Sequence, residues 1–228
     1  MLSDRIGELN DRIASACADT GRSVDSVQLV AVTKNHSREM LLEAIEAGLR
    51  VFGENRVQEA VEKYHGLLEG IQLHLIGHLQ SNKTKFIPGF FSWVESIDSL
   101  RIAEALSRRL SDAQSSCSVL LQVNSTGEET KSGFSDPNEL LEAADQMREL
   151  PGISVRGLMT IGPFTTDSAS ISRAFEQTRL LYDRLRAQLA GAAIDTLSMG
   201  MTDDLEIAIA EGSTEVRIGT ALFGSRTG

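Results

Sequence analysis

The feature that most constrains the fold is a repeated unit: a short apolar run, then glycine or polar residues, then an amphipathic stretch. The apolar runs lie at 27–33, around 51–52, and at 73–76, 92–95, 119–123, 155–161, 196–199 and 215–218. Runs of this length between turn-forming residues predict strands. The first run, VQLVAVT, is nearly all apolar, which is typical of a parallel strand covered on both faces.

Helices are predicted between these strands from apolar residues at helical spacing. The first precedes all strands, at 3–18, and the others lie at 57–68, 100–110, 171–189 and 203–210. Two further helices have polar residues suited to the cap position at their starts. One begins after Ser37 and ends at Gly48, and the other opens at Asp136 and runs to about residue 150.

Strict alternation of strand and helix implies parallel strands joined by helical crossovers. Eight such units in 228 residues match the count for one closed barrel. The sequence therefore predicts a single (β/α)8 TIM barrel with parallel strands and an extra N-terminal helix. An open doubly wound sheet is the alternative, but it would need fewer strands or a larger chain.

The overall charge is acidic, with 22 Lys and Arg residues against 32 Asp and Glu residues. Such a field argues against sequence-independent nucleic-acid binding, and it means that an anionic ligand must be bound by a local set of donors. Cys17 and Cys117 are expected to be reduced, buried thiols of a cytoplasmic protein. No apolar stretch approaches the roughly 20 residues that span a membrane, and the first residues do not form a signal peptide.

Lys34 is the first candidate for chemistry. It directly follows the strand at 27–33, and α/β barrels build their active sites at the carboxyl ends of their strands. At a partly desolvated strand end the ammonium form is disfavoured, so the amine can attack a carbonyl carbon. Taken alone, this position favours the alternative, a surface lysine at a strand end that forms a weak ion pair.

Glycine and hydroxyl residues follow the last two strands. Ser198 precedes Gly200 in one loop, and Gly219 precedes Thr220 in the other. In barrels these two loops frequently form a phosphate site, where glycine leaves backbone N–H groups accessible. The acidic pair at 203–204 would repel phosphate, so we place the phosphate contacts on Ser198, Gly219 and Thr220. The alternative is that the glycines only form tight turns.

Arg217 lies between two apolar residues of the last strand, so alternation places it on the opposite face, inside the barrel. A buried arginine needs a partner. That partner could be an anion, a heteroaromatic nitrogen, or a barrel carboxylate such as Glu54. Asn55, after the second strand, can hydrogen-bond a ligand oxygen or cap the next helix.

No metal site is predicted. The chain has four histidines, and no cluster of His, Cys and Asp stands at ligand spacing. His74 and His78 are four residues apart, but Gly77 and the strand context remove the helical face that such a pair needs.

Taken together, these segments resemble the pyridoxal phosphate homeostasis protein family, whose fold is similar to the N-terminal barrel of alanine racemase. The matching segments are LVAVTK at 29–34, FGENRVQE at 52–59, LIGHLQSNK at 75–83, QVN at 122–124 with KSG at 131–133, RGLMT at 156–160, LSMGMTDD at 197–204 and VRIGTALFG at 216–224. They follow one another in order along nearly the whole chain, so the resemblance is specific. His36 and His78 are less typical of the family.

The resemblance implies one barrel domain over residues 1–228 that binds pyridoxal phosphate (PLP) as its cofactor. It implies a Schiff base on Lys34, a phosphate held by Ser198, Gly219 and Thr220, and a pyridine nitrogen that faces Arg217. It also places Asn55 beside the ring.

The function that follows is cofactor homeostasis: a carrier or buffer of PLP that affects amino-acid balance, without robust catalytic activity. A guanidinium keeps its charge at working pH, so Arg217 would leave the ring nitrogen unprotonated and weaken the electron sink that carbanion chemistry needs. The chain also ends shortly after the barrel, where alanine racemase has a second domain. We expect a cytoplasmic monomer whose partners are PLP and the apo forms of PLP-dependent enzymes, with no nucleic acid and no membrane.

Two alternatives stay open. The first is a small single-domain PLP-dependent amino-acid racemase, with His78 as its base. The second is a Schiff-base aldolase or a phosphate-sugar isomerase on the same barrel, without any cofactor.

Overall fold

The computed structural model describes residues 1–126 and 132–224. Within them, eight parallel strands close into a barrel in sequence order, and β1 pairs with both β2 and β8. The strands are β1 (Gln28–Val32), β2 (Val51–Glu54), β3 (Gln72–Leu75), β4 (Trp93–Ile97), β5 (Cys117–Val123), β6 (Ile153–Thr160), β7 (Thr196–Ser198) and β8 (Glu215–Ile218). The predicted closed α/β barrel is confirmed, and the open sheet is wrong.

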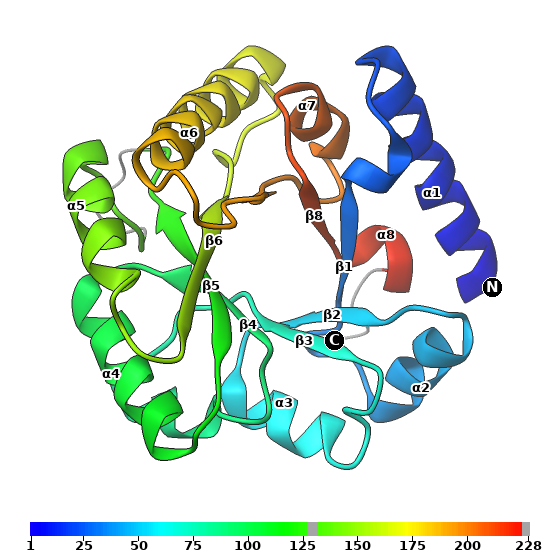
Figure 1. The fold of residues 1–228 in the computed structure, drawn as a ribbon. Coiled ribbons are helices and arrows are strands. Elements are labelled where there is room, and N and C mark those ends of the chain that lie inside the picture. Colours follow the sequence, from blue (N-terminus) through cyan, green and yellow to red (C-terminus); the bar gives the residue numbers. More distant parts are fainter. Residues whose placement is uncertain (127–131, 225–228) are drawn as a thin grey trace.

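Figure 1 shows the helices as a ring outside the strands. They are α1 (Leu2–Asp19), α2 (Arg38–Glu46), α3 (Val57–Tyr64), α4 (Leu100–Asp112), α5 (Pro137–Met147), α6 (Ser168–Gln188), α7 (Leu205–Ala210) and α8 (Thr220–Phe223). Short 3₁₀ helices occupy η1 (Val24–Ser26) and η2 (Ser81–Phe86). The predicted caps are present, since Ser37 accepts from the Met40 N–H and Asp136 from the Asn138 N–H.

Several helical segments differ from the prediction. Helix α3 ends at Tyr64 rather than near residue 68, and α7 begins at Leu205 rather than at 203. Helix α8 and the 3₁₀ helix η2 were not predicted. Both are too short to show a hydrophobic period, so the pattern that identifies longer helices gives no signal there.

The extra N-terminal helix is confirmed and packs against α7 and α8, beside the first strand (Figure 1). Its buried residues Leu9 and Ile13 are one helical turn apart, so they face the same side and join the main apolar core. Among the described residues no helix combines the length and the apolar character that would let it span a bilayer. Lys131, in the KSG segment, lies outside the described residues.

The two faces of the strands differ in chemistry. Outward-facing residues such as Leu73, Leu75 and Ile218 belong to the apolar core between the strands and the helices. The inward-facing residues include a layer of buried polar side chains, among them His74 and Glu95. The interiors of α/β barrels are usually filled by branched apolar residues, so this buried polar layer is unusual and indicates a specific role.

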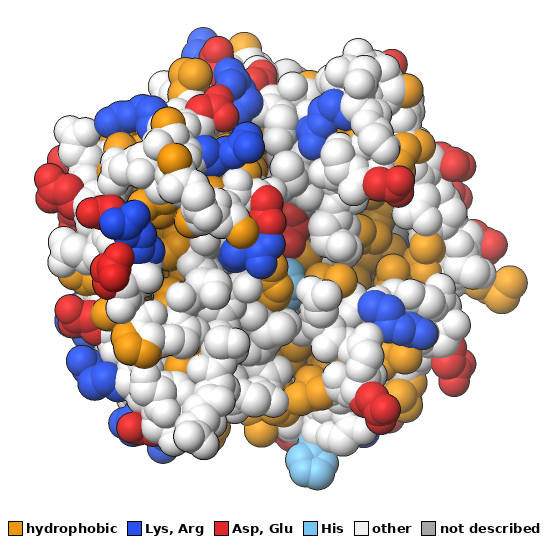
Figure 2. Space-filling model, in the orientation of Figure 1, with side chains coloured by type: hydrophobic (Ala, Val, Ile, Leu, Met, Phe, Trp, Pro, Cys, Tyr) orange, Lys and Arg blue, Asp and Glu red, His pale blue; other side chains and the backbone are white. Residues whose placement is uncertain are grey.

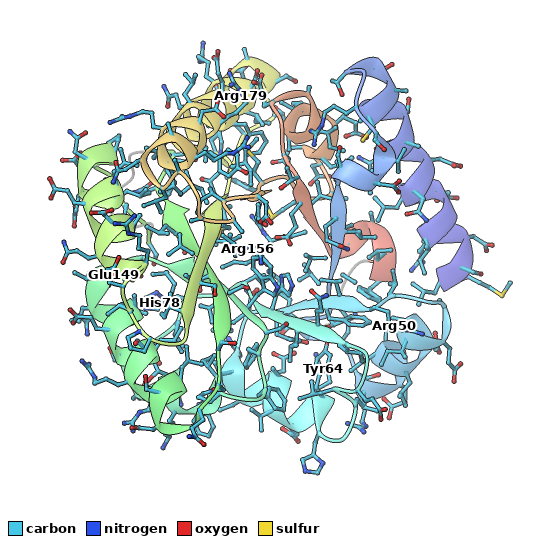
Figure 3. The ribbon with its side chains drawn as sticks, viewed as in Figure 1. Arg50, Tyr64, His78, Glu149, Arg156 and Arg179 are labelled. Carbon is cyan, nitrogen blue, oxygen red and sulfur yellow. The ribbon has the colours of Figure 1, made fainter. Side chains whose placement is uncertain are left out.

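Side chains also fill one end of the barrel. Figure 2 shows acidic and basic side chains gathered at the centre of the face in view, and Figure 3 labels Arg156 there. Arg156 pairs with Asp195, and its guanidinium carbon lies 5.3 Å from the centre of the Trp93 ring. Trp93 in turn stacks on His74 with ring centres 5.2 Å apart. This stack reaches from the surface to the polar layer.

Candidate functional site

A cavity of about 480 Å³ lies at the carboxyl ends of the strands. Five of the six predicted site residues line it, and they come from β1, β2 and β8 or the loops after them: Lys34, Asn55, Arg217, Gly219 and Thr220. Since β1 is hydrogen-bonded to both β2 and β8, these strand ends are neighbours at one side of the mouth. The sixth residue, Ser198, is fully buried and is not among the described lining residues.

Lys34 enters the cavity because of strand alternation. Val32 and Lys34 both line the cavity, whereas Thr33, between them, points to the helix layer and bonds Glu54 and Tyr64. The Lys34 side chain is half-buried. The turn that follows contains Asn35 in the left-handed region, with φ 61°. The backbone N–H of Asn35 donates to Glu59 Oε1 at 2.6 Å, which ties this turn to α3.

Behind Lys34 lies a buried cluster that we call the outer network: Thr33, Glu54, Glu59, Lys63 and Tyr64. The Lys63 ammonium donates to Thr33 O at 2.6 Å, to Glu54 Oε1 at 2.8 Å and to Glu59 Oε1 at 3.0 Å. The Thr33 hydroxyl lies 2.7 Å from Glu54 Oε1 and 2.6 Å from the Tyr64 hydroxyl. All three donor positions of this ammonium are thus occupied by protein oxygens.

Burial raises the pKa of Glu54, although the Lys63 ammonium opposes that shift. Glu54 is bound to Lys63, and the carboxylate near Arg217 is another one, so the possible partner named from the sequence, Glu54, does not pair with Arg217. The reason is the pleat of β2. A Cβ on Gly53 would meet Val30 and Ile76, so Gly53 faces the barrel interior and Glu54 faces the helices.

Asn55 lines the cavity and does not cap α3, whose N-cap is Arg56. Its backbone is held by Gly77 on the neighbouring loop. A Cβ at position 77 would lie 2.2 Å from Asn55 O and 2.7 Å from Asn55 Cα. Only glycine lets the two loops approach this closely, so Gly77 fixes the place of Asn55 at the cavity wall.

The loops after β7 and β8 meet at the cavity beside Lys34. Gly219 is close to β1, since a Cβ there would lie 3.3 Å from Val32 O. Thr202 also lines the cavity, and its hydroxyl accepts from the backbone N–H of Ala221, which joins the two loops at 3.2 Å. Asp204, one of the two acidic residues, is turned into the fold and accepts from the Met201 N–H at 2.5 Å.

Below the cavity lies a second buried cluster, the inner network: His74, Glu95, Ser198, Glu215 and Arg217. Arg217 is 4% exposed, and its guanidinium donates to Ser198 Oγ at 2.6 Å and to Thr160 O at 2.7 Å. The Ser198 hydroxyl donates to Glu95 Oε2 at 2.8 Å. The carboxylate that faces Arg217 is thus Glu95, 3.9 Å from the guanidinium.

The pKa values of the two carboxyl groups in the inner network are shifted in opposite directions. Burial alone would raise the pKa of Glu95, but the hydrogen bond with His74 and the charges of His74 and Arg217 outweigh it and lower that pKa. Burial and the negative charge of Glu95 raise the pKa of Glu215 well above its ordinary value. The surroundings thus favour the charged form of Glu95 and the protonated form of Glu215, because two carboxylates there would repel each other.

His74, Glu95 and Glu215 also form a group of possible metal ligands, with donor atoms within 4.8 Å of one another among the described residues. Sequence spacing gave no sign of it, since the three residues come from three strands. His74 Nδ1 and Glu95 Oε1 are hydrogen-bonded at 2.7 Å. Two ligands of a tetrahedral zinc ion at about 2.0 Å would stand about 3.3 Å apart. The described geometry is thus that of a hydrogen-bonded network.

Two histidines lie at the cavity wall. His78 is half-exposed, and its Nδ1 lies 3.0 Å from Asp98 Oδ2. His36 packs on Phe223 of α8 with ring centres 5.0 Å apart. A histidine oriented by a carboxylate can move a proton, so the His78–Asp98 pair puts a group of that kind at the cavity wall, in the loop after β3.

Sequence reasoning missed Thr202 and Glu95. Thr202 lies in the loop after β7 that the sequence analysis had singled out. Its position four residues after Ser198 could have identified it, because that loop, rather than the strand, lines the cavity. Glu95 could not be identified in this way, because sequence spacing does not show which residues of other strands a side chain in β4 meets inside the barrel.

With the fold and the cavity established, comparison with known proteins defines the class. A family model described as alanine racemase, N-terminal domain, matches residues 10–227. The chain is 41% identical over 228 residues to the pyridoxal phosphate homeostasis protein of Pasteurella multocida, covering 99% of this chain and 97% of that protein. It is 44% identical to the protein of the same name from Pseudomonas aeruginosa, covering 99% and 96%.

The chain belongs to the pyridoxal phosphate homeostasis protein family. Among solved structures it is similar to PipY of Synechococcus elongatus with PLP bound, at 37% identity and a TM-score of 0.86. That match covers 98% of this chain and all of PipY, 100%. The resemblance stated from the sequence is confirmed.

Proposed function

We propose that this chain binds PLP as a Schiff base on Lys34 and acts in PLP homeostasis as a carrier or buffer of the cofactor. The observation that carries the proposal is the convergence of Lys34, Arg217, Gly219 and Thr220 on one cavity. A PLP-bound relative of the same fold and the names of the curated relatives support it.

The donor set suits PLP from end to end. An amine for the aldehyde stands on β1, and a guanidinium for the ring nitrogen lies on the cavity floor. Backbone and hydroxyl groups at Gly219, Thr220 and Thr202 suit the phosphate, in the loops where barrels commonly bind it. The buried Ser198 hydroxyl is engaged by Glu95 and Arg217, so we move the third phosphate contact from Ser198 to Thr202.

The same geometry supports a holding function over a catalytic one. PLP bound there would supply an electron sink for chemistry at an amino-acid α-carbon. A permanently charged guanidinium opposite the ring nitrogen disfavours protonation of that nitrogen, which weakens the sink. We therefore propose that the chain keeps the aldehyde bound and protected, and that turnover of amino acids is negligible.

Borohydride reduction of the PLP-loaded protein, followed by peptide mass mapping, tests the proposal. We expect a pyridoxyl group on Lys34, and loss of the visible absorbance band in Lys34→Ala. The matched control is Lys83→Ala, a half-buried lysine on η2, which should keep the band. A band that persists in Lys34→Ala would overturn the proposal.

A racemase stays the second candidate because of one observation, the His78–Asp98 pair at the cavity wall. If His78 moved the substrate proton, purified protein would racemise a single L-amino acid, and His78→Ala would abolish that activity. Absence of racemisation in the wild-type protein would exclude this candidate.

We further propose a monomer that works in the cytoplasm and passes PLP to apo forms of PLP-dependent enzymes. Cys17 and Cys117 are free and buried, which suits a reducing compartment. Light scattering of the purified protein tests the monomer. Reconstitution of an apoenzyme by the loaded protein, faster than by dilute free PLP, tests the transfer.

A further inference from the structure

Arg217 is held from two sides. Of its two terminal nitrogens, one donates to Ser198 Oγ at 2.6 Å and the other to Thr160 O at 2.7 Å. Because a guanidinium is planar and its donors point in fixed directions, two bonds on different nitrogens define its plane. The same side chain lines the cavity, so the network below the cavity sets what a ligand meets on the floor.

Ser198 is the link in this arrangement. A hydroxyl has one proton to donate and lone pairs to accept with. The Ser198 proton goes to Glu95 Oε2 at 2.8 Å, which leaves its oxygen free to accept from Arg217. Ser198 is 0% exposed, so no water competes for either bond in the described structure.

Glu95 anchors the link. Its other oxygen, Oε1, lies 2.7 Å from His74 Nδ1, and His74 is stacked on Trp93. The carboxylate is therefore fixed at both oxygens and cannot follow a movement of Arg217. Glu215 faces the same group from β8, with Oε2 3.7 Å from His74 Nδ1, and burial together with the negative charge of Glu95 raises its pKa.

We propose that Ser198 and Glu95 are positioning residues that hold the Arg217 guanidinium on the cavity floor, at the place where the PLP ring nitrogen would lie. This inference rests on the proposed function and assigns Ser198 a role different from phosphate binding. Without Ser198 the guanidinium would keep its bond to Thr160 O and its longer contact with Glu95 at 3.9 Å, but it would lose the second hydrogen bond that defines its plane.

The first test compares Ser198→Ala with Ser107→Ala in the full chain. Ser107 is a matched control: it is 4% exposed, its hydroxyl donates to Pro151 O at 2.8 Å, and it lies on α4 away from the described cavity lining. Titration of each apo protein with PLP should give about tenfold weaker binding for Ser198→Ala, as for the loss of one hydrogen bond to a charged group. Ser107→Ala should bind within about twofold of the wild type.

A spectroscopic readout separates positioning from mere stability. In nitrogen-15 NMR of the apo protein, the side-chain N–H signals of Arg217 should exchange slowly with water in the wild type and in Ser107→Ala. They should exchange rapidly in Ser198→Ala, since the guanidinium has lost one partner. Equal exchange and equal PLP affinity in the two variants would overturn the inference.

Glu95 is tested by rescue. Glu95→Leu removes the acceptor, so it should weaken PLP binding about as much as Ser198→Ala, whereas Glu95→Gln keeps an amide oxygen for Ser198 and should recover most of the affinity. If neither Glu95 variant folds, the Ser198→Ala pair decides. The two proposals fail separately: a wild-type protein that binds no PLP contradicts the proposed function, while the NMR experiment still tests the positioning.

Discussion

The inner and outer networks contain the same kinds of side chain, but the cation of the inner network lines the cavity and that of the outer network contacts protein oxygens. Each buries one basic side chain, at least one carboxylate and a hydroxyl within a few ångströms. In the outer network Lys63 donates all three of its hydrogen bonds to protein oxygens. It belongs to α3, as does Tyr64, which Figure 3 labels outside the ring of strands. In the inner network Arg217 bonds the protein below and lines the cavity above.

The difference teaches that a buried ion pair does not by itself mark a functional site. Perturbed carboxyl pKa values occur in both networks, at Glu54 and at Glu215. What separates them is access, since only the inner network presents a charged group to a ligand. The outer network should therefore govern stability, and the inner network should govern both stability and PLP binding.

The largest effect is expected when the outer network loses its cation. Lys63→Met leaves the Glu54 carboxyl buried without its partner, which should lower the free energy of unfolding by about 3–5 kcal/mol. PLP affinity of the folded protein should stay within about threefold of the wild type, because Lys34 leaves β1 on the face opposite Thr33. Urea denaturation of the apo protein and PLP titration measure the two quantities, with the exposed Lys85→Met as control. A tenfold loss of PLP affinity in Lys63→Met would show that the outer network also contributes to PLP binding.

A pH series on Glu215→Gln should give the next largest effect. The folded state raises the pKa of Glu215, so its favourable contribution is complete below the unfolded value of about 4.3 and is lost as pH rises towards the folded value. Glutamine imitates the protonated acid and loses nothing. The variant should therefore gain stability over the wild type by up to about 1.4 kcal/mol per pH unit within that window.

Denaturation midpoints between about pH 5 and 8 measure this gain. The exposed Glu43→Gln serves as control, and its difference from the wild type should stay nearly constant. If the stability difference between Glu215→Gln and the wild type were also independent of pH, folding would not raise the pKa of Glu215. The opposite pKa shifts of Glu95 and Glu215 would then be contradicted.

The smallest effect is expected from Tyr64→Phe. It removes the hydroxyl that lies 2.6 Å from Thr33 Oγ1 and should cost about 1–2 kcal/mol of stability, with PLP binding unchanged. Tyr182→Phe is the matched control, a buried tyrosine whose hydroxyl donates to Ile194 O at 3.2 Å. Weaker PLP binding in Tyr64→Phe alone would show that the outer network positions the turn after Lys34.

The sequence carried the barrel and most of the site because both depend on order along the chain. Eight apolar runs alternate with amphipathic stretches, and Lys34, Gly219 and Thr220 directly follow strands whose ends must meet at one face. The contents of the interior could not be predicted in the same way. Alternation predicts that Arg217 points inward. Which strand places a carboxylate opposite it depends on the tilt and stagger of the strands, so the sequence could offer Glu54 only as a possible partner, and Glu95 stands there instead. Strand order places Ser198 at the end of β7, but it does not show that the side chain is fully buried and outside the described cavity lining.

The stack of Arg156, Trp93 and His74 has a consequence for exchange of the ligand. Among the described residues, Arg156, Trp93 and His74 pack at the far end of the barrel, while the cavity that Lys34 lines is formed by the loops after the strands. Under the proposed function, PLP would then enter and leave the cavity through the same opening. A protein that supplies PLP and a protein that receives it would then bind at the same opening, one after the other.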